Sequence, residues 1–102
     1  MSTKSNLTLG SVGTILRWEN ERVRVWNLIL EPGESSPWHP HTMDYVVVAM
    51  EADSLRVEFE DGTVEERVPK QGDVVFYPRH QVHRAINTGK VRYRNTIIEL
   101  KD

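Results

Sequence analysis

Short runs of apolar or alternating apolar and polar residues recur along the chain, separated by turn-forming residues. Their spacing is the 8 to 12 residues or so that is typical of all-β domains. Val, Ile, Tyr, Trp and Phe fill these runs, and such side chains suit a pleated, half-buried surface. No window keeps an apolar period near 3.6 residues, so we expect almost no helix. The pattern predicts strands over residues 14–18, 22–30, 45–50, 55–60, 63–68, 73–77, 82–86 and 91–100.

Glycine-containing pairs mark the turns between these strands, at residues 32–33, 61–62, 71–72 and 88–89. Asp61-Gly62 separates two alternating runs, which is a strong signal for a tight hairpin. About eight short strands at even spacing indicate an all-β sandwich or a small barrel. Composition does not separate the two, but in both the alternate side chains of each strand face an interior.

A chain of 102 residues is long enough for one domain with a single modest core. Residues 1–13 are rich in Ser, Thr, Gly and Asn and are expected to form a loose arm or a short edge strand, with one domain over residues 14–102. The limited core of so small a domain makes pairing with a second copy plausible, and we predict a homodimer in which a partner covers apolar sheet edges.

Charge and cysteine usage exclude several function classes. The 13 Lys and Arg residues are interleaved with 15 Asp and Glu residues, and the net charge is -2. No basic stripe exists, so we expect neither nucleic acid nor an anionic membrane as partner. The absence of cysteine removes disulfides, zinc–thiolate sites and thiol nucleophiles. The sequence also shows no apolar segment typical of a signal peptide or membrane span, and a cytoplasmic location is expected.

Two of the four histidines, His39 and His41, stand one residue apart in the stretch SPWHPHTMDY. On an extended segment their side chains face the same side, about 6.5 to 7 Å apart, so two imidazoles can converge on one ion. A metal site needs a third ligand from another strand and an open position for water or substrate. His83 begins a predicted strand just after a turn and is the obvious candidate, while His80 would need a particular loop conformation to join.

Two sequence motifs surround these histidines. The first, GESSPWHPH, runs from Gly33 to His41, and the second, GDVVFYPRHQVHRAIN, runs from Gly72 to Asn87. Together they resemble the paired signature of the cupin family, G-x5-H-x-H followed by G-x5-P-x-(G)-x2-H-x3-N. The resemblance covers residues 22–100. The chain resembles in particular the small single-domain cupins of the BauB type, through ERVRV, the W-H-x-H stretch and MDYVVV.

The resemblance implies a jelly-roll barrel with a metal at the bottom of an open cup, and ligands His39, His41 and His83. It matches Gly33 and Gly72 to the turns before each motif, and Pro78 and Asn87 to the segments that place the last histidine. The implied cofactor is one divalent transition metal. Imidazole ligands suit Fe, Ni, Cu and Zn, and Mn fits if waters complete the shell.

The chain departs from the family where most members carry a glutamate ligand, because Tyr45 and Val46 stand there. Three readings follow. The site can consist of three neutral imidazoles and solvent, which leaves the ion its full charge and favours an anionic chelating substrate. Tyr45 can replace the glutamate, since it shares parity with His39 and His41. A bulge can instead turn Asp44 inward as the fourth ligand.

Other residues near the motifs are expected around the cup. Trp38, Met43, Phe76 and Tyr77 flank the motifs, and some of them should form an apolar wall that selects substrate. His80 replaces a family glycine and is either a proton shuttle at the rim or a solvated turn residue. The alternating pairs Arg22/Arg24 and Arg92/Arg94 offer arginines for a substrate carboxylate if their face lines the cup, and otherwise face solvent or an interface.

The function expected from these features is a mononuclear metal enzyme that acts on a small organic acid or carbonyl compound, with a dioxygenase or an isomerase or lyase as reaction types. In this scheme Tyr45 and His80 are the catalytic side chains. The alternative is a non-catalytic module in which the cup binds a small molecule. Thiol oxygenases with a Cys–Tyr crosslink are excluded because the chain has no cysteine.

Overall fold

The computed structural model describes residues 10–102, and within this range it contains nine strands and no helix. The described range therefore contains no apolar helix able to span a bilayer. The strands are β1 (Ile15–Glu19), β2 (Val23–Leu30), β3 (His39–His41), β4 (Asp44–Glu51), β5 (Leu55–Phe59), β6 (Val64–Arg67), β7 (Val74–Tyr77), β8 (Gln81–Asn87) and β9 (Tyr93–Leu100).

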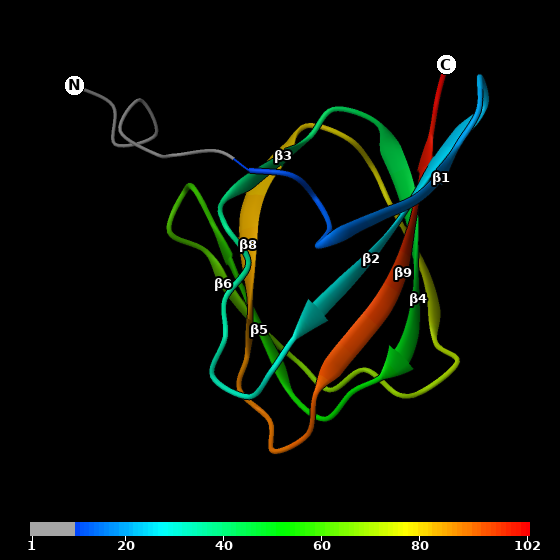
Figure 1. The fold of residues 1–102 in the computed structure, drawn as a ribbon. Coiled ribbons are helices and arrows are strands. Elements are labelled where there is room, and N and C mark those ends of the chain that lie inside the picture. The colour runs from blue at the N-terminus through cyan, green and yellow to red at the C-terminus, as the bar shows by residue number, and fades with distance from the viewer. Residues whose placement is uncertain (1–9) are drawn as a thin grey trace.

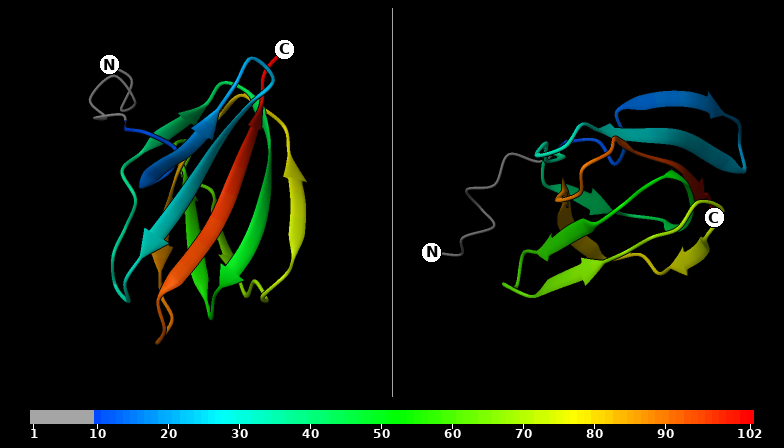
Figure 2. Two further views of the ribbon diagram at one scale, coloured as in Figure 1. Left: turned by 45° about the vertical axis from the view of Figure 1, so that its right-hand side comes forward. Right: turned by 90° about the horizontal axis from the view of Figure 1, so that it is seen from below.

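The strands form two antiparallel sheets that face each other as a jelly-roll barrel (Figures 1 and 2). One sheet has five strands in the order β1-β2-β9-β4-β7, and the other has four in the order β3-β8-β5-β6. Each crossover places strands that are distant in the sequence side by side. The consequence for the site is that β3 pairs with β8, so the two halves of the histidine pattern become neighbours.

The interior between the sheets is lined by alternate residues of the strands, as the period-2 pattern predicts. Along β9 every second residue is buried, beginning with Tyr93. The buried apolar cluster consists of Val12, Leu28, Leu30, Tyr45, Leu55, Val57, Ala85, Tyr93 and Ile97. The all-β prediction is confirmed, and the eight expected strands are all present within one or two residues of their predicted bounds.

The ninth strand, β3, is the element that the pattern does not predict. It is three residues long and has a proline in the middle, so no alternating run of β-branched residues marks it. Of the expected arm, residues 1–9 lie outside the described residues. Val12 is buried in the core, and Gly10 N donates a hydrogen bond to Trp38 O at 2.7 Å. The packed part of the chain therefore begins before residue 14.

Backbone conformation explains the turn residues near the site. The Asp61-Gly62 hairpin joins β5 to β6, and Gly62 has a φ of 91°. His80 has a φ of 77° and is the one described residue other than glycine with a positive φ. Its backbone N donates to His41 O at 2.8 Å, which fixes the turn between β7 and β8 against β3. Glycine adopts this left-handed conformation most readily, which agrees with the glycine of the motif that the sequence resembles at this position.

Candidate metal centre

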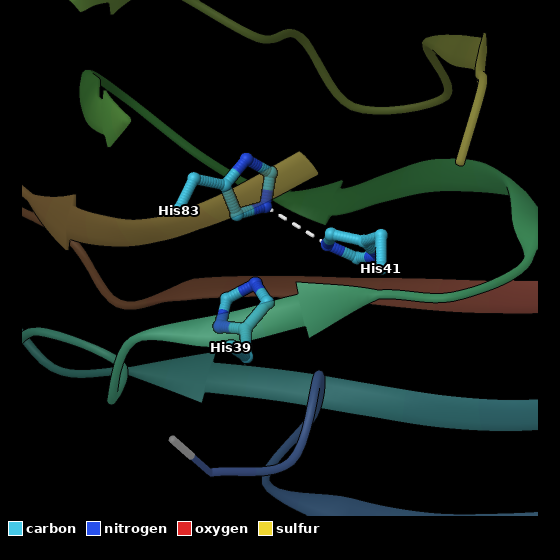
Figure 3. A group of neighbouring side chains, drawn as sticks. All are labelled: His39, His41 and His83. Carbon is cyan, nitrogen blue, oxygen red and sulfur yellow. Dashed lines mark hydrogen bonds between the residues drawn. The ribbon is translucent and has the colours of Figure 1, made fainter. Parts of the chain in front are cut away.

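Three histidine side chains converge inside the barrel, two from β3 and one from β8 (Figure 3). His39 lies directly opposite His83 in the ladder between these strands, and His41 follows two residues later on the same face. One nitrogen of each imidazole lies within 4.8 Å of the other two, and all three residues are buried. The geometry therefore joins the three predicted ligands in one cluster.

A hydrogen bond fixes the tautomer of His39. Its Nδ1 lies 2.9 Å from the carbonyl oxygen of Pro37, which can only accept, so Nδ1 carries the proton. The lone pair of the neutral ring is then on Nε2, the other ring nitrogen. Such a second hydrogen bond orients a metal-binding histidine and raises the basicity of its ligand nitrogen.

His41 and His83 meet through their Nε2 atoms at 2.9 Å, while Nδ1 of each ring is buried and has no hydrogen-bond partner in the described structure. Two neutral rings satisfy this contact only if one Nε2 carries a proton, which leaves a bare Nδ1 on one ring and an unpaired N–H on the other. A metal would instead accept both Nε2 lone pairs. Two ligand nitrogens that each lie about 2.1 Å from an ion, at right angles around it, are about 3 Å apart. The two Nε2 atoms here are 2.9 Å apart. The residues present fit a metal ion.

Burial keeps these imidazoles neutral. Burial, and to a smaller extent the neighbouring imidazoles, lowers the pKa of His41 from 6.5 to about 2. Burial is also the main cause that lowers the pKa of His83 to about 3, with smaller contributions from His39 and Arg67. Burial also lowers the pKa of His39, although its bond to Pro37 and the charge of Glu99 act against this. The imidazoles are therefore neutral at neutral pH and carry free lone pairs, which is the state that metal ligation requires.

Tyr45 lies beside the cluster. Its ring stacks on His41 with centroids 3.8 Å apart and an interplanar angle of 11°, and its hydroxyl lies 3.5 Å from Gln81 Oε1. Burial raises its pKa, so the phenol stays protonated. Asp44 is turned elsewhere: one of its oxygens accepts hydrogen bonds from Arg79 N and Nε at 2.9 and 3.1 Å. The register irregularity of β4 lies between Ala49 and Glu51, not at Asp44.

A cavity of about 340 Å³ extends from the three histidines along the interior. Most of its wall is aliphatic, with Tyr45, Tyr77 and Tyr93 as the aromatic contribution and Arg67, Asp73 and Asn95 as further polar side chains. The deepest of these polar groups are paired, because Asn95 Nδ2 donates to the Tyr93 hydroxyl at 2.8 Å and Asn95 Oδ1 accepts from Leu28 N at 3.2 Å. The cavity suits a small molecule with an apolar body.

Four residues expected near the cup do not line this cavity. Phe76 is 57 % exposed, because its neighbours Val75 and Tyr77 take the inward positions of β7. Trp38 is half-buried under the guanidinium of Arg84, and Met43 is half-buried in the turn before β4. His80 is exposed in its turn.

The arginines of the alternating strands also lie apart from the cavity. Arg24 pairs with the buried Glu99 at 2.8 Å, and Arg92 and Arg94 both pair with Glu51, at 2.8 and 3.2 Å. Arg67 is the cavity arginine that the sequence analysis missed. The alternation of residues 63–68 could have placed the Arg67 side chain on the cavity side, but only once the inward-facing residues of β6 were known.

Glu99 is a second residue that the sequence analysis missed. It is 1 % exposed and lies opposite Tyr45 in the ladder between β4 and β9. Its Oε1 accepts hydrogen bonds from Arg24 Nε at 2.8 Å and Trp26 Nε1 at 2.7 Å. The alternation along β9 was the signal that could have placed this carboxylate inside the barrel.

Comparison with known proteins agrees with this architecture. The family model described as "Cupin domain" matches residues 26–98. A cupin domain from Bordetella pertussis Tohama I is 32% identical, with a TM-score of 0.81 over 92% of this chain and 96% of its own. A cupin superfamily protein from Desulfitobacterium hafniense DCB-2 is 21% identical, with a TM-score of 0.65 over 100% of this chain and 90% of its own.

An oxalate oxidase structure is also 21% identical, with a TM-score of 0.62 over 78% of this chain and 42% of its own, and shares the fold alone. A search of curated proteins gives no match. The family model spans more than half of the chain, and the B. pertussis domain is alike over nearly all of it. The chain therefore belongs to the cupin family.

Proposed function

We propose that this protein is a mononuclear metal-dependent cupin enzyme that acts on a small organic acid or carbonyl compound. The observation that carries the proposal is the convergence of His39, His41 and His83 at one end of a largely apolar cavity. The three imidazole nitrogens would hold the ion and leave positions open on the cavity side. When bound, a divalent transition metal would supply Lewis-acid polarisation of a substrate oxygen or a site for dioxygen.

The surrounding side chains determine what such a site does. Three neutral ligands would leave the charge of the ion uncompensated by the protein, which favours a substrate with a net negative charge. Tyr45 keeps its proton because burial raises its pKa, so its hydroxyl is a hydrogen-bond donor, and it lies 3.5 Å from Gln81 Oε1. The largely aliphatic wall makes the cavity less polar than water, which strengthens electrostatic interactions within it. The same fold serves an oxalate oxidase, so it is compatible with chemistry on a small acid.

Metal analysis tests the proposal. Protein stripped with a chelator and reloaded separately with Fe, Mn, Ni, Cu and Zn should bind one of these ions stoichiometrically, and His83→Ala should abolish binding. His80→Ala is the matched control, because His80 lies in the adjacent turn and outside the cluster. The proposed metal site is wrong if neither variant loses the metal, or if the wild type binds no metal stoichiometrically. Oxygen-uptake and turnover assays with small carboxylates and diketones then separate an enzyme from a binding module.

A homodimer belongs to the same proposal. The edge strand β1 exposes Ile15, Leu16 and Trp18 at 39%, 47% and 57%, and such an apolar edge is normally covered. Analytical ultracentrifugation of the wild type and of Trp18→Lys tests it, since the charged edge should shift the protein toward the monomer. Cytoplasmic location and the absence of nucleic-acid binding stay predictions from the sequence.

A further inference from the structure

We propose that Arg67 binds the carboxylate of the ligand, and that this ligand is a small monocarboxylic acid with an apolar body. The inference rests on the proposed function only in that the cavity is taken as the ligand site. Among the described residues, Arg67 is the one Lys or Arg side chain that lines the cavity. It is the last residue of β6, the edge strand of the four-stranded sheet, and its side chain is 25% exposed.

Aromatic contacts connect the guanidinium to the histidine end of the cavity. Its Cζ lies 5.1 Å from the centroid of the Tyr77 ring, and this ring stacks on Tyr45 at 5.3 Å. Tyr45 in turn stacks on His41 at 3.8 Å. Two tyrosine rings thus separate Arg67 from the cluster, and a ligand anchored at Arg67 can extend along them toward the histidines.

The present partner of Arg67 is a weak competitor for a ligand. Nε and Nη2 of Arg67 donate to a single oxygen of Glu65, Oε1, at 3.0 and 2.6 Å. This is not the two-oxygen arrangement in which arginine binds carboxylates most strongly. The Glu65 side chain is 48% exposed, and ion pairs with that much solvent contribute little to stability. A carboxylate that enters the largely apolar cavity can therefore replace Glu65 at low cost.

The rest of the cavity sets the chemical class of the ligand body. Apart from the histidines, Tyr45, Tyr77 and Arg67, its polar side chains already have partners within the protein: Asn95 with Tyr93 and with the β2 backbone, and Asp73 with the backbone N of Lys70. Few donors or acceptors remain for a polyol or a sugar. Aliphatic residues such as Val47, Val57 and Ile97 instead offer contact to a hydrocarbon body.

The test compares an acid with its neutral amide. Binding of 4-methylpentanoate and 4-methylpentanamide is measured by NMR titration at constant ionic strength, with both the chelator-treated and the metal-loaded protein. The variants are Arg67→Gln, which removes the proposed anchor, and Glu65→Gln, which removes the competing carboxylate. Arg56→Gln is the matched control, since Arg56 forms a similar pair with Glu66 on the neighbouring strands at 2.7 Å but does not line the cavity.

We expect the acid to bind about tenfold more tightly than the amide, the scale of a charge-assisted pair. Arg67→Gln should erase this preference, Glu65→Gln should increase it, and Arg56→Gln should leave it unchanged. Equal binding of acid and amide, or a preference that survives in chelator-treated Arg67→Gln with its circular dichroism spectrum intact, would overturn the inference. If metal analysis finds no stoichiometric binding while the chelator-treated protein shows an Arg67-dependent preference, this inference stands and the proposed metal function fails, so the two failures are distinguishable.

Discussion

Mild acid should destabilise the metal-free protein because His41 and His83 are buried in their neutral form. Burial lowers the pKa of these side chains from 6.5 to about 2 and about 3. In the unfolded chain both imidazoles return to their ordinary pKa and take up protons near pH 6.5. Between pH 7.5 and pH 5 the unfolded state therefore binds more protons than the folded state, and the free energy of unfolding falls as the pH falls.

The pKa values give the size of this effect. Each histidine that titrates at 6.5 only when unfolded removes about 2 kcal/mol between pH 7.5 and pH 5, so the pair removes about 4 kcal/mol. His39, whose pKa burial also lowers, acts in the same direction. Asp and Glu in an unfolded chain titrate near pH 4, below this range, so protonation of carboxylates adds little above pH 5. A loss of about 4 kcal/mol is a large fraction of the roughly 5 to 15 kcal/mol that stabilise a typical domain.

Urea denaturation followed by tryptophan fluorescence, at several pH values between 7.5 and 5 in the presence of a chelator, measures this loss. His83→Gln keeps a neutral polar side chain but removes one titrating group, so its pH dependence should be smaller by about 2 kcal/mol. The reasoning is refuted if the wild type loses less than about 1 kcal/mol over this range, or if His83→Gln shows the same pH dependence as the wild type.

Substitutions at three further positions test the packing around the site. Asn87→Ala should cost about 3 kcal/mol in urea denaturation, because its side chain makes three hydrogen bonds of 2.9 Å to the backbone from a buried position. Val57→Ala should cost about 2 kcal/mol in the same assay, and an unchanged midpoint would contradict its burial in the core. Glu99→Ala should destabilise more than Glu99→Gln in thermal melts, since only glutamine keeps an acceptor for the Trp26 N–H.

Local patterns were sufficient to predict most of the fold. Alternation and β-branched composition located eight strands, and Asp61-Gly62 located the hairpin between β5 and β6. The pattern failed at β3, where a strand of three residues with a central proline is held by its ladder to β8 rather than by its own propensity. Whether such a short strand forms depends on its pairing with a distant strand, and a local sequence pattern contains no information on that pairing.

Part of the candidate site was also predictable. The resemblance of the segments around His39, His41 and His83 to the cupin motifs implied the cluster that the structure brings together. The cavity wall was harder, because the expected Phe76 takes the outward position of β7 and Arg67 the inward position of β6. The choice between adjacent residues depends on strand register, and a register error of one residue exchanges the two faces.

The ladder between β3 and β8 has a consequence for how the protein is made. His39 and His41 emerge early during synthesis, but His83 lies directly opposite them only after β8 has been made and paired. Such contacts between distant parts of the chain form late in folding, since loop closure must precede them. An ion that uses all three histidines would therefore bind after β3 and β8 have paired, and would not guide the earlier folding of the chain.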